Sequence, residues 1–113
     1  MSWRELYYKN GAIYAKISEE KREYFYEDGT KKTIETYQDG RLHGEAVLYW
    51  PNGRLKRRLC FAQGKRHGVE EIWNEAGRQL DKGKYYKGRP IGVHSRWNAE
   101  GELVEEEVFD AKP

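Results

Sequence analysis

Hydrophobic and polar residues alternate in short runs along this chain, and turn-forming residues separate the runs. Two of the clearest runs are residues 45–50 and 54–61. Runs of six to eight residues are too short for most helices and have the usual length of β-strands. The apolar positions of this region are all odd-numbered: Val47, Tyr49, Leu55, Leu59 and Phe61. Arg54, Lys56 and Arg58 hold even positions and Arg57 is an exception, so alternation predicts one apolar and one basic face.

Glycine recurs with a period of 24 residues, and ten of the 12 glycines fall into three columns. These columns are Gly29, Gly53, Gly77 and Gly101; Gly40, Gly64 and Gly88; and Gly44, Gly68 and Gly92. A fixed period of this length is typical of repeat proteins, in which each unit is one supersecondary element that packs on its neighbours.

The residues before the first-column glycines indicate that each repeat is a β-hairpin. Asp28 and Asn52 form Asp-Gly and Asn-Gly pairs, which tolerate positive φ and suit tight hairpin turns. Ala76 and Glu100 hold this position in the later repeats, so the sequence defines those two turns less well.

Aromatic residues follow the same period, four positions before and eight positions after each first-column glycine. They are Phe25, Tyr49, Trp73 and Trp97 in one column and Tyr37, Phe61, Tyr85 and Phe109 in the other. Cross-strand aromatic pairs add roughly 0.2–1 kcal/mol each. We expect Tyr49, Trp73 and Trp97 to form a stacked ladder.

The period predicts an all-β fold: a single-layer, elongated antiparallel sheet of tandem 24-residue β-hairpin repeats. First-column glycines should lie at one rim of the sheet and second-column glycines at the other. We expect one domain over 1–113, made of a partial N-terminal repeat (7–23), repeats 24–47, 48–71 and 72–95, and a C-terminal partial repeat (96–113). Gly83 in the third repeat predicts a bulge or irregular pairing.

The N-terminal unit departs from the period. The segment around Gly11 copies the segment around Gly40, and five additional residues at 18–22 then interrupt the repeat. We predict a longer loop there. Any helix in the chain should fall within residues 18–24, because Glu19, Glu20, Lys21 and Arg22 favour helix locally.

Two segments resemble a known repeat family. Residues 37–44 read Tyr-Gln-Asp-Gly-Arg-Leu-His-Gly, and residues 48–55 read Leu-Tyr-Trp-Pro-Asn-Gly-Arg-Leu. This motif resembles the MORN repeats, and most closely the MORN-variant repeats of bacterial proteins often labelled as antitoxins. The resemblance covers roughly residues 7–109, although Lys31 and Gln79 replace the usual leucine two places after the turn glycine. It implies a hairpin-repeat fold and a scaffold or binding role.

Composition and motifs limit the chemistry. With 37% hydrophobic and 35% charged residues, the chain cannot fill a thick two-layer core. It contains no nucleophile elbow, zinc-protease helix motif, P-loop or dinucleotide fingerprint, so we expect no catalytic residues, cofactor or metal. His43 and His67 hold equivalent positions, expected about 9–10 Å apart and too distant to share one zinc ion. We expect them to pack against turns.

Three further features have ordinary structural interpretations. The single Cys60 allows no internal disulfide and predicts a buried or half-buried thiol in a reducing compartment. The N-terminal residues lack the apolar core of a signal peptide, and the longest apolar run, 46–50, is too short to cross a bilayer. We therefore expect a soluble cytoplasmic protein. Glu105, Glu106 and Glu107 are expected to form a solvated acidic edge.

Positive charges gather between residues 54 and 66, where no acidic residue occurs, and they continue on the next repeat. We predict that a partner contacts the even-numbered face of these strands; the alternative is a solvated outer face that only keeps the chain soluble. The predicted partner-binding residues are Trp50, Arg54, Lys56, Arg58, Arg78 and Lys82. Such a basic face would steer an acidic protein or anionic lipid, and Trp50 would be its anchor.

Three classes of function remain. The leading one is a non-enzymatic protein-binding repeat module, in its finer form an antitoxin or immunity-like inhibitor of a toxin or effector with an acidic surface. The alternative is a MORN-like scaffold at an anionic membrane surface. An enzyme or nucleic-acid binder is the third, but a net charge of +2 without a reading element disfavours specific nucleic-acid binding. Unpaired sheet edges also predict self-association.

Overall fold

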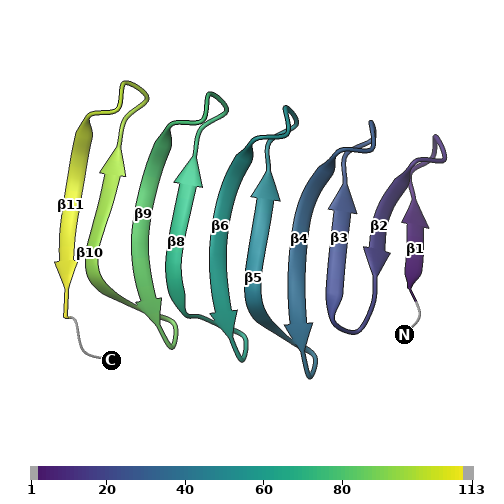
Figure 1. Cartoon of the computed structure of the whole chain (residues 1–113), viewed down its shortest axis with the longest axis horizontal. Helices are drawn as coiled ribbons and strands as arrows, with labels where there is room; N and C mark the ends of the chain where they lie inside the picture. Colours follow the sequence, from purple (N-terminus) through teal and green to yellow (C-terminus); the bar gives the residue numbers. More distant parts are fainter. Residues whose placement is uncertain (1–2, 111–113) are drawn as a thin grey trace.

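The computed structural model describes residues 3–110, which form one sheet of antiparallel strands (Figure 1). The strands are β1 (Arg4–Tyr7), β2 (Ile13–Ile17), β3 (Lys21–Phe25), β4 (Lys31–Gln38), β5 (Arg41–Tyr49), β6 (Leu55–Ala62), β7 (Lys65–Arg66), β8 (Gly68–Trp73), β9 (Gln79–Tyr86), β10 (Arg89–Trp97) and β11 (Leu103–Phe109). They lie side by side in chain order, and the two-residue β7 pairs with β6.

The sheet is a single layer. Its extents are 46 × 36 × 15 Å, and the shortest of these leaves no room for a second layer of secondary structure. Residues 3–110 contain strands and turns but no helix. The predicted all-β, single-layer antiparallel sheet of tandem hairpins is therefore confirmed.

The turns at the upper rim in Figure 1 share one hydrogen-bond pattern. In the turn after β5, the Gly53 N–H donates to the Trp50 carbonyl, and the Trp50 N–H donates to the Arg54 carbonyl. Only the glycine has positive φ, at 88°. The Asn52 side-chain oxygen accepts the Arg54 N–H. First-column glycines therefore occupy this rim as predicted. The Asp28 and Asn52 side chains before Gly29 and Gly53 act as hydrogen-bond acceptors, and neither residue adopts positive φ.

The two turns that lack this asparagine or aspartate use a different residue. In the turn after β8, Asn74 lies two positions before Ala76, and its side-chain oxygen accepts the N–H groups of Ala76 and Arg78. Asn98 does the same in the turn after β10. All upper turns therefore have the same backbone shape although the capping side chain moves along the sequence.

The turns at the lower rim are two-residue hairpins. Asp39, Gln63 and Lys87 have φ of 51°, 52° and 49°, and each precedes a second-column glycine that also has positive φ. Two successive positive φ angles define the turn type whose twist matches paired strands. His43 and His67 pack against the next turn along, as predicted: Nδ1 of His43 accepts the Gln63 N–H at 3.2 Å, and Nδ1 of His67 accepts the Lys87 N–H at 3.4 Å.

The N-terminal repeat is shorter than the others, which corrects the predicted long loop. Gly11 lies in a turn with the upper-rim pattern, in which its N–H donates to the Tyr8 carbonyl and the Tyr8 N–H donates to the Ala12 carbonyl. It therefore corresponds to Gly29 and not to Gly40. At the lower rim a tight turn joins β2 to β3, and the Ser18 N–H donates to the Lys21 carbonyl. Residues 18–22 form neither a long loop nor a helix.

The strand register shows which residues share a face of the sheet. Ala46 pairs with Leu59, and Val47 pairs with Arg58. Odd-numbered residues of β5 thus share a face with even-numbered residues of β6, so the predicted partition into one odd apolar face and one even basic face is wrong. We call the face that carries Ala46 and Leu59 face 1, and the face that carries Val47 and Arg58 face 2.

Bulges interrupt the alternation near the rims. Between β5 and β6 the register shifts so that Lys56 and Arg57 together oppose Leu48. Between β9 and β10 it shifts across Gly83, as predicted, but a corresponding shift between β4 and β5 has no glycine on β4. Each shift has a glycine with positive φ on the other strand of the pair. It is Gly92 on β10, with φ of 68°, and Gly44 on β5, with φ of 92°. The third glycine column is therefore the periodic cause of these bulges.

The core is thin and lies on face 1. Ala15, Ala46 and Leu59 are the buried hydrophobic residues, and no large side chain is fully buried in the described part of the chain. The ring pairs of residues 3–110 do not join Tyr49, Trp73 and Trp97, which corrects the predicted ladder. Each repeat adds two strands, so equivalent rings lie about 9–10 Å apart, beyond aromatic stacking distance.

Candidate binding surfaces

Trp50 and Lys56, two of the predicted partner-binding residues, contact each other. The Lys56 ammonium lies 4.6 Å from the centroid of the Trp50 ring. The indole Nε1–H of Trp50 donates to the carbonyl of Trp73, one repeat further along, at 3.0 Å. Trp50 therefore links two repeats, in addition to any contact that it makes with a partner.

Arg54 and Arg78 lie at the upper rim and also link repeats. Nη1 of Arg54 donates to the Glu75 carbonyl at 3.3 Å, and Nη1 of Arg78 donates to the Glu100 carbonyl at 3.1 Å. Each guanidinium thus crosses to the next upper turn. A backbone carbonyl does not neutralise the positive charge, so both arginines still present a cation at this rim.

Arg58 and Lys82 lie on face 2, on either side of Glu71. The register pairs Glu71 with both residues, and Nη2 of Arg58 is 3.1 Å from a Glu71 carboxylate oxygen. Burial alone would raise the pKa of Glu71, but hydrogen bonds from Gln79 and Arg58 overcome this effect and lower it. The six predicted residues therefore divide between Trp50 with Lys56, the upper rim, and a charge-compensated row on face 2. They do not form one continuous basic surface.

Face 1 carries a cluster of charges that the sequence analysis did not identify. Glu70 is 6% exposed, and its carboxylate forms ion pairs with Arg57 and, at 3.4 Å, with Arg66. Next to it, Arg96 lies between Asp81 at 4.0 Å and Glu105 at 2.7 Å. The signal available in the sequence was Arg57, the one residue that broke the predicted alternation.

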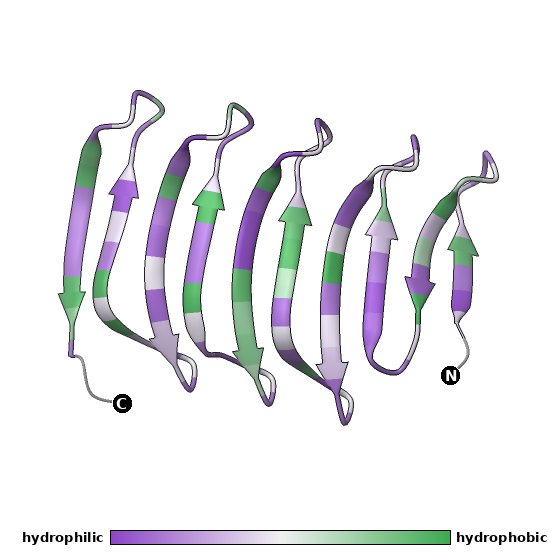
Figure 2. Ribbon diagram, in the orientation of Figure 1, coloured by the Kyte–Doolittle hydropathy of each residue, from purple (hydrophilic) through white to green (hydrophobic). Residues whose placement is uncertain are grey.

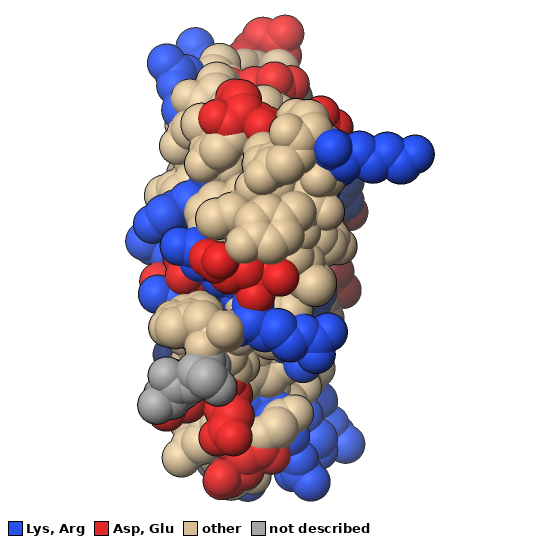
Figure 3. All heavy atoms as spheres, turned by 90° about the vertical axis from the view of Figure 1, so that its right-hand side faces the viewer, with Lys and Arg blue, Asp and Glu red and all other residues tan. Residues whose placement is uncertain are grey.

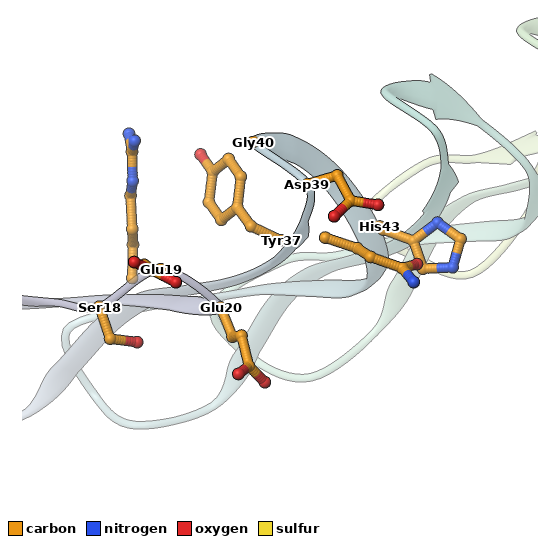
Figure 4. Close-up of a pocket in the computed structure, with 9 residues that line it drawn as sticks. Ser18, Glu19, Glu20, Tyr37, Asp39, Gly40 and His43 are labelled. Carbon is orange, nitrogen blue, oxygen red and sulfur yellow. The ribbon is translucent and has the colours of Figure 1, made fainter. Parts of the chain in front are cut away.

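A hollow of about 780 Å³ opens at the lower rim, beside the short N-terminal repeat. Figure 4 shows Ser18, Glu19 and Glu20 on one side of it and Asp39 and His43 on the other. The Arg22 guanidinium lies 4.5 Å from the centroid of the Tyr37 ring, which is part of the lining. Arg22 thus occupies the aromatic surface that a ligand entering the hollow would otherwise contact.

The C-terminal strands expose aliphatic side chains. Leu103, Val104 and Val108 of β11 are 53%, 58% and 73% exposed, and Val93 of β10 is 51% exposed. Val93 pairs with Val108 on face 2, and Val69 of β8, which is 41% exposed, lies on the same face. We call Val69, Val93 and Val108 the C-terminal apolar patch. Val93 and Val108 are direct neighbours, whereas Lys84 of β9 lies beside Val69. Exposed apolar residues that gather on one face are typical of protein-binding surfaces.

Other chemistry is sparse in residues 3–110. No three His, Cys, Asp or Glu side chains in this part of the chain are grouped so that they could hold a metal ion. Cys60 is half-buried, and burial raises the pKa of its thiol. Among these same residues there is no helix long and apolar enough to span a membrane.

The fold and these surfaces define a class of protein: an open, single-layer sheet of tandem β-hairpins. A comparison with family models identifies the class further. Residues 42–63 match the MORN repeat variant, which supports the predicted resemblance to the MORN-variant repeats. The matched segment contains β6 and most of β5, which is one complete hairpin around the Gly53 turn.

Comparisons with curated proteins and solved structures add little. No curated protein matches the chain. Among solved structures, the crystal structure of S. aureus TarM G117R in complex with fondaparinux, alpha-GlcNAc-glycerol and UDP has a TM-score of 0.46 at 19% identity, over 94% of this chain and 19% of that one. A second TarM crystal structure gives 0.45 at 19% identity, over 95% of this chain and 19% of that one.

A third solved structure is the GtfA/B complex bound to UDP and GlcNAc. Its TM-score is 0.43 at 11% identity, over 95% of this chain and 24% of that one. This chain therefore spans only about a fifth to a quarter of the length of the solved structures that it resembles.

Proposed function

We propose that this chain is a non-enzymatic protein-binding repeat module of the cytoplasm, and that the C-terminal apolar patch is its main contact surface. The observation that carries this proposal is the concentration of exposed aliphatic side chains on β8, β10 and β11. A solvated face would be expected to carry polar side chains at these positions, since exposing Val93 and Val108 to water has no structural benefit.

The charges around the patch support a protein partner over a membrane. Glu71, Lys82 and Glu106 alternate in sign on the same face, so the surface suits a partner of mixed charge. An anionic bilayer would require a cluster of uncompensated basic residues. The finer proposal is an antitoxin or immunity-like inhibitor, in which the patch covers part of a toxin or effector.

A pull-down with the purified chain, followed by binding kinetics on the recovered partner, tests the proposal. Val93→Ser combined with Val108→Ser should weaken binding at least tenfold, mainly by faster dissociation, because the lost contacts are apolar. Tyr7→Ser is the matched control, because Tyr7 is 57% exposed on β1, at the opposite end of the sheet. Equal weakening by both variants would contradict the assigned surface.

The recovered partner and the serine variant also distinguish an inhibitor from a protein scaffold and from a membrane scaffold. An inhibitor should abolish the activity of the recovered partner at a one-to-one ratio, whereas a scaffold should bind without inhibiting. Co-sedimentation with phosphatidylserine vesicles, unchanged by the serine variant, would favour the membrane scaffold and would count against the proposal.

A further inference from the structure

We propose that β11 is a docking edge at which an extended basic segment of a partner protein adds one more antiparallel strand to the sheet. This inference rests on the proposed protein-binding function and names its mode and its partner chemistry. Three features of β11 lie together: an open strand edge, three consecutive glutamates, and apolar residues at both ends of the strand.

The two edges of the sheet differ. β1 has four residues, whereas β11 has seven, so β11 offers the longer row of unpaired backbone groups. Figure 2 shows that β11 is hydrophobic at both ends and hydrophilic in the middle. Short strands are one of the ways in which proteins protect a sheet edge, and an edge strand of this length is a template for strand addition.

Charges on face 1 alternate along the rows that lead to this edge. Asp81 pairs with Arg96, and Arg96 pairs with Glu105. The sign of the side-chain charge therefore alternates from strand to strand along this row, and the row ends at a negative residue on β11. A cation on the next strand would continue the row, because opposite charges on directly paired residues stabilise a sheet.

Neighbouring rows end in the same way. On face 2, Glu71 pairs with Lys82, Lys82 with Ser95, and Ser95 with Glu106. On face 1, His94 pairs with Glu107. Glu105, Glu106 and Glu107 thus end three adjacent rows, and each would face a basic residue of an added strand.

The row that contains Val93 and Val108 determines the direction and composition of the partner segment. Val93 pairs with Val108, which is 73% exposed, and no strand of residues 3–110 pairs with the outer side of β11. An apolar residue opposite Val108 would extend the C-terminal apolar patch by one strand. In the antiparallel direction of the sheet, the segment reads as one apolar residue followed by three basic residues.

A second copy of this chain fits the edge poorly. Two β11 strands paired in antiparallel register would place glutamates opposite glutamates, which is destabilising. The β1 end is not basic: Figure 3, which faces that end, shows acidic and basic side chains interspersed. In this sheet, Glu5 and Glu106 belong to one cross-strand row, and Leu6 and Glu105 belong to the next. If β1 of a second copy paired with β11 so that these rows continued, Glu5 would face Glu106 and Leu6 would face Glu105.

The test uses the whole chain and a fluorescent peptide with one valine followed by three lysines between threonines. We expect saturable binding by anisotropy that weakens as salt increases. Two peptide controls are matched in sequence: one carries glutamate in place of lysine, and the other carries N-methyl groups on the amides that would pair with β11. Both should bind at least tenfold more weakly. Equal binding of the N-methylated peptide would overturn strand addition and leave only charge attraction.

Variants of the chain complete the test. Glu105→Lys with Glu107→Lys should lose the lysine peptide and gain the glutamate peptide. Because Glu105 also pairs with Arg96, Glu107→Lys alone is the milder variant, and it should weaken the lysine peptide by about threefold or more. Glu19→Lys with Glu20→Lys at the lower rim is the control and should leave binding unchanged. Absence of any binding to the wild-type chain would overturn the inference.

The outcome for the proposed function can be read separately. If the partner recovered by pull-down needs Val93 and Val108 but binds the Glu105 and Glu107 variant normally, the module binds protein through its face and the docking edge is wrong. If neither set of variants affects the partner, both proposals fail.

Discussion

The N-terminal and C-terminal halves of the sheet have the same backbone pattern but are joined by different side chains. In the N-terminal half, an aromatic residue at the start of each upper turn reaches the next repeat: the Tyr8 hydroxyl donates to the Phe25 carbonyl at 2.6 Å, and the Tyr26 hydroxyl donates to the Tyr49 carbonyl at 2.7 Å. Trp50 makes the last link of this kind. Arg54 of the same turn also donates to the next upper turn. In the C-terminal half, asparagine replaces the aromatic residue, and the arginine link remains without it.

Face 1 changes in the same direction. Tyr8, Tyr14 and Tyr24 form successive edge contacts at 5.4 and 6.0 Å in the N-terminal half. From β6 onward, ion pairs around Glu70 and Arg96 occupy the corresponding rows. The glycine period therefore specifies the backbone, whereas the side chains that join the repeats are interchangeable between apolar and charged solutions. The charged half should be the more sensitive to removal of a single partner.

The largest expected effect is that of Arg57→Ala. This change leaves the buried Glu70 carboxylate with Arg66 as its remaining ion-pair partner. Removing one partner of a buried ion pair costs roughly 3 kcal/mol, because the other charge stays desolvated. Urea denaturation should show the loss, and Arg57→Ala combined with Glu70→Ala should recover part of it. A double variant as unstable as the single one would show that packing, and not charge burial, dominates here.

A smaller effect is expected for the aromatic links. Trp50→Phe keeps most of the ring but removes the Nε1–H that donates to the Trp73 carbonyl, and one such hydrogen bond contributes about 1 kcal/mol. Arg78→Ala is the matched change in the other half, where the exposed bond to the Glu100 carbonyl should contribute about 0.5 kcal/mol. Thermal denaturation of both variants measures the difference. A larger loss for Arg78→Ala would reverse the order of the two kinds of link.

Much of this fold follows from the sequence, because glycine at a positive φ is a strict requirement. Gly53 and Gly77 mark one rim, and Gly40 and Gly64 mark the other, as their period predicts. Gly11 was assigned to the wrong rim because both kinds of turn use an Asn-Gly or Asp-Gly pair. The hydrogen bonds that distinguish them involve residues outside the pair.

The faces and the partner-binding residues were harder to predict. A bulge at Lys56 inserts one residue, and a shift of one residue moves every following side chain to the opposite face. Alternation counted across that point therefore fails. Arg58 was interpreted as a free basic residue, but its partner Glu71 lies 13 positions away. Pairing at this separation depends on register, which a pattern of charges along one strand does not contain.

The smallest predicted effect compares two carboxylates on opposite faces. Burial, with the nearby Glu70 charge, raises the pKa of Asp81 above its ordinary 3.8, against the opposing effects of Arg96, His94 and Arg57. A raised pKa in the folded state contributes stability that is present below pH 3.8 and is lost as the pH rises through the raised value. Asp81→Asn should therefore gain stability relative to the wild type over that interval, by less than about 1 kcal/mol because Asp81 is partly exposed.

Glu71→Gln should behave in the opposite way. The lowered pKa of Glu71 contributes stability above its ordinary 4.5 that is lost as the pH falls through the lowered value. This variant should be less stable than the wild type at neutral pH, by less than about 1 kcal/mol, and the difference should shrink in acid. Urea denaturation between pH 3 and pH 7 measures both variants against the wild type. If the two differences changed with pH in the same direction, the contrast between the desolvated carboxylate on face 1 and the hydrogen-bonded one on face 2 would be wrong.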